Sequence, residues 1–417
     1  MRDSQRFRDS LRARMMTIAG ASSVGLAALA QGCGSEIRVE HTSTSGDAGS
    51  GGQAGHGMGG NGTGGSIIVI TTSSSGGGAT VDAGPMIAHH CLPMSEAGVC
   101  PEGDAAMAEF MNYQWTWCQQ VVAIVTGPNV ENGECCYDVE VQEFPCYVGR
   151  TFFVDQGAIK ANLRRGSTWA RGPRPNAQSL PPRTREALAD AWSRDGLFEH
   201  ASVASFARFS MQLLALGAPA DLVRDTHAAI LDEVRHAELC LALASEYAGY
   251  SVEPAELPFP APIVITPDLA AVVTETVMEG CIGETVAAMQ AYESLLLSED
   301  PAVREVLEVT VEDETRHAEL AFRFVAWALD VGGNDVRNAV IRALAGFRPP
   351  STSPENLDDV SVDMYRAHGR IPAREARIMA ERALQQIVVP CICALLSRVP
   401  ASIAGPSEAS VRARLGA

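Results

Sequence analysis

Two nearly identical stretches of the sequence carry side chains that could bind metal ions. They are DEVRHAELC at 232–240 and DETRHAELA at 313–321, which agree at seven of nine positions. In each, a Glu and a His lie three residues apart, as the pairs Glu233/His236 and Glu314/His317. Residues three apart share one face of a helix, so the two side chains of a pair can reach one point. Each stretch could therefore give a metal ion one carboxylate and one imidazole.

Two further Glu interrupt apolar helical faces, Glu199 in LFEHASVASFARF and Glu284 in CIGETVAAM. Helices reversing near 216–217 and near 299 would place all four Glu about 15–17 residues from a turn, or roughly 23–26 Å at 1.5 Å per residue. The Pro-rich linker 250–266 could span up to about 56 Å, more than the roughly 46 Å of a helix over 219–249. The two helical hairpins can therefore bring their carboxylates to one level.

Four buried carboxylates need compensating charge. Two divalent cations would balance them, and two neutral His would complete the ligand set of a dinuclear, carboxylate-bridged site in a helix bundle. The competing interpretation is a solvated pattern of charges spaced i,i+3. We favour the metal site because the pattern occurs twice, on faces that are otherwise apolar.

With these residues, region 184–331 resembles the ferritin-like superfamily of di-iron and di-manganese carboxylate proteins, in which two helices each give a Glu and two each give an ExxH. The resemblance implies a four-helix bundle holding two Fe or Mn ions, with Fe preferred. It implies that Glu233 and Glu314 bridge the metals and that Glu199 and Glu284 are terminal ligands. It also implies chemistry with oxygen or peroxide.

The wider DExRH form looks like that of oxygen-activating di-iron oxygenases, in which the Asp accepts a hydrogen bond from a ligand His and pairs with the Arg. Such a contact fixes the tautomer of the His. The implied pairs are Asp232 with His317 and Asp313 with His236, with Arg235 and Arg316 beside them. Several neighbours receive no such role: we expect Glu275 and Glu279 to face solvent, His200 to be a packing or surface residue, and Cys240 and Cys281 to pack in the core.

The fold class expected is mainly α. Apolar spacing predicts helices near 184–216, 219–249, 267–298 and 300–331, followed in the C-terminal region 332–417 by helices near 334–347 and 371–398. The apolar run IVVPCICALL is too short to span a membrane, so we interpret it as a buried segment kinked at Pro390.

Residues 1–32 have the pattern of a signal peptide: an Arg-rich start followed by an uncharged stretch. ALAQGC resembles a bacterial lipoprotein cleavage box, which implies lipid attachment at Cys33 and, because Gly34 follows, an outer-membrane location in the cell envelope. Ordinary signal-peptidase cleavage, or a leader kept as an anchor, are the alternatives. Residues 33–88 are rich in Gly and Ser and are interpreted as a disordered, flexible tether.

Residues 89–165 form a small Cys-rich region with short predicted strands. Its six cysteines are an even number in a short segment, which in an exported chain indicates disulfides of undetermined pairing rather than a metal site, because no CxxC spacing is present. They are Cys91, Cys100, Cys118, Cys135, Cys136 and Cys146.

The charge balance excludes one class of partner. The net charge is −18, and the five Arg and two Asp of residues 1–32 give that segment +3, so a chain beginning at Cys33 carries −21. Such an acidic chain does not bind nucleic acid through its phosphates. Three functions stay open: an oxygen- or peroxide-dependent oxidoreductase supplied by an external electron donor, metal binding without turnover, and a structural surface lipoprotein. Neither substrate nor oligomeric state follows from the sequence.

Overall fold

The computed structural model describes residues 2–20, 86–94, 99–106 except 104, 119–143 except 132–133, and 149–398 with gaps at 155–156, 260–261, 348–356 and 358. The chain divides into two compact units. One, the strand unit, is Arg38–Phe144, and the other, the helical unit, combines Met1–Ile37 with Pro145–Ala417.

The strand unit contains an antiparallel sheet of β1 (Met86–Pro93), β2 (Gln119–Glu131) and β3 (Glu134–Glu143), in the order β1-β3-β2. Its register puts Cys91 opposite Cys136, and these two form a disulfide. A second disulfide joins Cys100 to Cys135. The predicted disulfides are thus confirmed for four cysteines, whereas Cys118, Cys146 and Cys33 lie outside the described residues.

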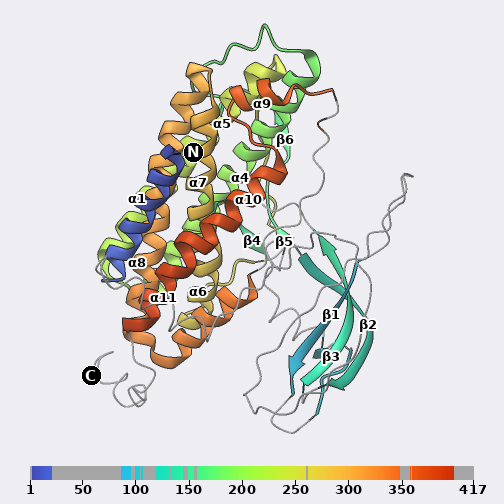
Figure 1. Ribbon diagram of the computed structural model, residues 1–417, viewed down its shortest axis with the longest axis vertical. Coiled ribbons are helices and arrows are strands. Elements are labelled where there is room, and N and C mark those ends of the chain that lie inside the picture. Colours follow the sequence, from blue (N-terminus) through green and yellow to red (C-terminus); the bar gives the residue numbers. More distant parts are fainter. Residues whose placement is uncertain are drawn as a thin grey trace, which may run out of the picture. The chain divides into compact units, whose positions relative to one another are not determined.

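Long helices dominate the helical unit (Figure 1). α4 (Pro182–Ala215) packs against α5 (Ala220–Ala248), and α8 (Pro301–Gly346) packs against α6 (Leu269–Glu275), η1 (Thr276–Glu284) and α7 (Thr285–Leu297). α5 and α8 also contact each other, which joins the two hairpins. The helices after α8 in the described part of the chain are α9 (Val362–Ala367), α10 (Ala373–Ala383), η2 (Leu384–Val388) and α11 (Val389–Arg398). The mainly helical class predicted from the sequence is confirmed.

Capping residues set the helix ends. The side chain of Asp300 accepts hydrogen bonds from the first backbone N–H groups of α8, and Asp268 does the same for α6. Both supply acceptors that a helix start lacks. Gly249, with φ of 78°, ends α5 in the left-handed conformation that glycine adopts without strain.

Two of the expected helices are less regular than the apolar spacing predicts. η1 interrupts the helix expected over 267–298 with π-type turns. η2 interrupts the helix expected near 371–398 just before Pro390, whose missing N–H and bulky ring prevent an α-helical ladder. Apolar spacing does not reveal η1, because all nine of its residues are buried and no single face marks its period. The two helices expected near 300–331 and 334–347 are both present, as the segments of α8 on either side of a kink at Gly333, whose φ of 58° is not helical.

Residues 149–180 connect to the helices rather than to the strand unit, although we expected residues up to 165 to belong to the Cys-rich region. β4 (Phe153–Val154) pairs with β5 (Gly157–Ala158), and β6 (Leu163–Arg165) pairs with β7 (Val252–Pro254) from the linker after α5. The Arg208 side chain of α4 donates to the Phe153 carbonyl at 2.7 Å. These contacts fix the segment to the helical unit.

The N-terminal helix α1 (Arg2–Ile18) lies alongside α8 and α11 (Figure 1). The Phe7 ring stacks on Tyr292 at 4.0 Å, and the Ser4 hydroxyl donates to Glu293 at 2.9 Å. Among the described residues, one helical stretch, Ala373–Arg398, is long and apolar enough to cross a membrane, and more than half of its apolar window is buried in the protein. That burial agrees with the core segment predicted around Pro390.

Candidate metal centre

The four helices of the two hairpins bring the six predicted ligands together. Glu199 comes from α4, Glu284 ends η1, and α5 and α8 give one Glu and one His each. Five of the six are almost fully buried, whereas the Glu199 side chain is 21% exposed. The centre therefore has one edge, at Glu199, that reaches solvent.

The ligand atoms form two overlapping groups, each with donor atoms within 4.8 Å of one another. The first, here the Glu199 group, is Glu199, Glu233, His236 and Glu314; the second, the Glu284 group, is Glu233, Glu284, Glu314 and His317. Donors around one ion at about 2.1 Å would lie up to about 4.2 Å apart, close to the observed spread, so each group can hold one cation after small side-chain movements. Glu233 and Glu314 belong to both groups, as carboxylates shared by two ions would.

Among the described residues, six buried polar atoms that face this point have no hydrogen-bond partner. They are Glu233 Oε2, His236 Nδ1, Glu284 Oε1 and Oε2, Glu314 Oε2 and His317 Nδ1. The two imidazole Nδ1 atoms lie near carboxylates, 3.2 Å from Glu233 for His317 and 3.4 Å from Glu314 for His236. Buried polar atoms without hydrogen bonds are costly and rare. Six of them pointing into one small volume, all of types that ligate Fe or Mn, fit the presence of metal ions.

Each ligand His is held from behind by an Asp of the other hairpin. His236 Nε2 donates to Asp313 at 3.1 Å, and His317 Nε2 donates to Asp232 at 3.3 Å. Because the carboxylate accepts at Nε2, the Nδ1 atom of each ring is left facing the ligand group. This cross-pairing is the one that the DExRH resemblance implies.

The two arginines of the motifs are placed differently. Arg316 forms ion pairs with Asp313 and, at 3.3 Å, with Asp232, so one guanidinium serves both aspartates. Arg235 is exposed and makes no such contact within the described part of the chain. The expectation that both arginines flank the aspartates therefore holds for Arg316 alone, because Arg235 points off the ligand face into solvent.

Burial and the mutual charges of the cluster shift the pKa values of its side chains. Burial, and then repulsion from Glu314, raises the pKa of Glu284 well above its usual value. Burial also acts to raise the pKa of Glu314, but the nearby His236 and His317 outweigh it and lower that pKa. The pKa of His317 rises to about 9 although burial opposes this, because Asp232, Glu233 and Glu314 stabilise the protonated ring. Without metal the cluster thus holds protons that cations would replace.

Glu279 is not at the surface as expected: it is 3% exposed. η1 turns it inward, where it accepts from Arg208 at 2.9 Å and from Ser205 at 3.0 Å, and its carboxylate lies 3.7 Å from Arg150. Arg150 was not among the predicted site residues, because it lies outside the predicted helices. A buried Glu279 would require a neighbouring cation, but Glu279 was expected at the surface.

Other residues near the centre have no ligand position. His200 packs edge-to-face on Trp169 with ring centroids 4.9 Å apart, which agrees with the expected packing role. Cys240 and Cys281 are buried, free thiols, also as expected.

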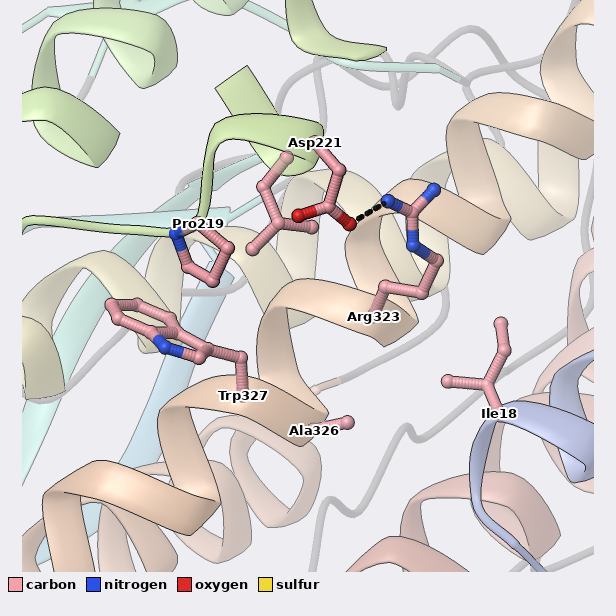
Figure 2. A pocket seen from close by; sticks show the side chains of 7 residues that line it. Ile18, Pro219, Asp221, Arg323, Ala326 and Trp327 are labelled. Atoms are coloured by element: carbon pink, nitrogen blue, oxygen red, sulfur yellow. Dashed lines mark hydrogen bonds and ion pairs between the residues drawn. The ribbon is translucent and has the colours of Figure 1, made fainter. Parts of the chain in front are cut away.

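A surface cavity of about 300 Å³ lies elsewhere on the helical unit. Figure 2 shows Arg323 directed at Asp221 across it, with Trp327 on its wall. Arg323 is already paired with Asp221 at 2.7 Å and with Asp225 at 2.6 Å. Trp327 follows His317 by ten residues, or about 15 Å along α8, so this cavity is separate from the ligand cluster.

No known protein family, curated protein or solved structure matches the chain. The buried carboxylates and imidazoles are therefore the observations that bear on function.

Proposed function

We propose that this protein is a ferritin-like protein that binds two Fe or Mn ions, with Fe preferred, in a helix bundle. The observation that supports this most strongly is the pair of overlapping Glu/His groups that share Glu233 and Glu314. In this proposal Glu233 and Glu314 would be shared by both ions, Glu199 and Glu284 would complete one site each, and each His would bind through Nδ1.

We further propose that the centre is used for oxidation with dioxygen or peroxide. Bound as a reduced pair, the ions would supply electrons to the oxidant. The chain's own contribution is to exclude water from the Glu284 side, to leave the Glu199 edge reachable, and to hold the His tautomers through Asp232 and Asp313. Electrons would come from an external donor or from the substrate.

Metal analysis tests the proposal. The full chain, purified anaerobically and reconstituted with Fe(II) or Mn(II), should bind about two ions per chain by mass spectrometry. Consumption of oxygen or peroxide by the loaded protein should exceed that of free metal. Two ions without such consumption would favour a non-catalytic metal-binding protein, and no ions at all would overturn the site.

For the N-terminal region we propose export and processing before Cys33, supported by the Arg-rich leader and the ALAQGC sequence. Removal of residues 1–32 would take α1 away and uncover Tyr292 and Glu293 on α7. The intact mass of the protein from a membrane fraction should then correspond to a lipid-modified chain beginning at Cys33. A chain that keeps residues 1–32 would instead make α1 a permanent helix of the unit.

A further inference from the structure

One arginine from outside the long helices is buried beside the Glu284 group. Arg150, which is 3% exposed, places its guanidinium over two rings of α4, 4.7 Å from the Phe206 centroid and 4.3 Å from the Phe209 centroid. Burying a cation is costly unless it is paired. A guanidinium in this position therefore needs nearby negative charge to compensate for the loss of water.

The backbone around Arg150 is fixed to both hairpins. The Ser202 hydroxyl of α4 donates to the Arg150 carbonyl at 2.9 Å, and the Gly149 N–H donates to the Gly283 carbonyl of η1 at 3.4 Å. Gly149 is also close to the Glu284 side chain, since a Cβ on Gly149 would lie 3.9 Å from Glu284 Oε2. Arg150 is thus held next to Glu284 by contacts on two sides.

No nearby carboxylate is paired with Arg150 alone among the described residues. Its Nε atom is 3.7 Å from Glu279 and has no hydrogen-bond partner in this part of the chain. Glu275, which also acts on Arg150, accepts a hydrogen bond from Gln212 at 2.9 Å. Glu279 makes its shorter ion pair, at 2.9 Å, with Arg208. The guanidinium also borders the helical turn before Glu284, because a Cβ on Gly280 would lie 3.3 Å from Arg150 Nη1, so the Arg150 charge acts on Glu284 as well.

We propose that Arg150 is a positioning residue that makes the two halves of the centre unequal: its charge weakens binding of a divalent cation by the Glu284 group, so that the Glu199 group fills first. This inference rests on the dinuclear centre proposed above. Like charges repel strongly in a buried, weakly polarisable environment. On the Glu199 side, the largely buried Arg370 is paired at 2.5 Å with Asp195, one helical turn before Glu199, so its charge is already neutralised.

The test is an anaerobic Mn²⁺ titration of the full chain that measures both dissociation constants from the signal of free Mn²⁺. Arg150→Met should tighten the weaker step by about tenfold. Arg208→Met is the matched control, because it removes another guanidinium from the same Glu279 but is not among the charges that act most on Glu284. It should change the weaker step by less than about threefold. Arg150→Lys, which keeps the charge, should resemble the wild type.

Glu279→Gln should change the dissociation constant of the weaker Mn²⁺ step in the opposite direction. It leaves both arginines without their shared carboxylate, so it should weaken this step. This variant tests the inference if Arg150→Met does not fold. Equal effects of Arg150→Met and Arg208→Met, or no effect of either Arg150→Met or Glu279→Gln, would overturn the inference while leaving the dinuclear centre in place. A wild-type chain that binds no Mn²⁺ would instead overturn the proposed function.

Discussion

The two hairpins of the helical unit carry the same motif but support it differently. In the first, α4 is regular through Glu199, whose side chain reaches solvent. In the second, π-helical η1 ends at Glu284, which is fully buried. π-type turns are rare and often occur at functional sites. A repeated sequence motif therefore does not make the two halves of the centre equivalent, because the neighbouring helices differ and residues 149–150 lie beside one half.

The largest effect should come from the carboxylates that both hairpins share. Glu233→Ala combined with Glu314→Ala removes two carboxylates from each group, so bound metal should fall from about two ions to none. Metal content by mass spectrometry measures this. Glu308→Ala, on α8 but 61% exposed, is the control and should keep both ions. Retention of two ions by the double variant would refute the bridging arrangement.

Variants of the two unshared carboxylates should show whether the Glu199 group and the Glu284 group bind metal differently. Glu284→Gln removes a ligand from a site that water reaches poorly, so we expect about one ion per chain. Glu199→Gln acts at the exposed edge, where water can take the vacant position, so it should weaken binding but keep two ions at high metal concentration. Equilibrium dialysis over a range of metal concentrations distinguishes the outcomes. Identical behaviour of the two variants would mean that the halves are equivalent.

A pH series should show how tightly protons and metal compete. Metal binding requires neutral His317, whose pKa is raised to about 9, so affinity should fall by about tenfold for each pH unit below that value through this proton alone. The folded-state pKa exceeds the usual 6.5, so the proton stabilises the metal-free protein fully below pH 6.5, and this contribution disappears as the pH rises to about 9.

Calorimetry checks both consequences. Between pH 6.5 and 9, the contribution of His317 should lower the unfolding temperature of the metal-free protein, while the increase caused by added metal should grow. A metal-induced increase that stays constant over this range would show that His317 does not exchange a proton for metal.

The smallest effect should distinguish the two motif arginines. Arg316→Gln removes the ion pairs to Asp232 and Asp313 that hold the ligand imidazoles, so metal affinity should fall by about tenfold. Arg235→Gln changes an exposed residue and should leave the affinity nearly unchanged. Mn²⁺ titration of both variants provides the measurement. A loss of equal size in Arg235→Gln would show that sequence symmetry matters more than the observed contacts.

Much of this arrangement was predictable from local pattern. Helical spacing located the long helices within a few residues, and counting from the turns placed Glu199, Glu233, Glu284 and Glu314 at one level. Both kinds of inference work because helix geometry converts residue number directly into rotation and rise. The signal peptide, lipid attachment and oxidoreductase activity stay predictions.

The mainly helical class, and which side chains share a helical face, follow from residue spacing along single elements. Three features follow instead from packing between distant segments: η1 turns Glu279 inward, Arg316 rather than Arg235 pairs with both aspartates, and Arg150 lies beside Glu284. Each of these depends on atoms far apart in the chain, whose contacts arise from packing and from the need to pair buried charges. The periodicity of a single helix does not show which distant residue will pair with a buried charge.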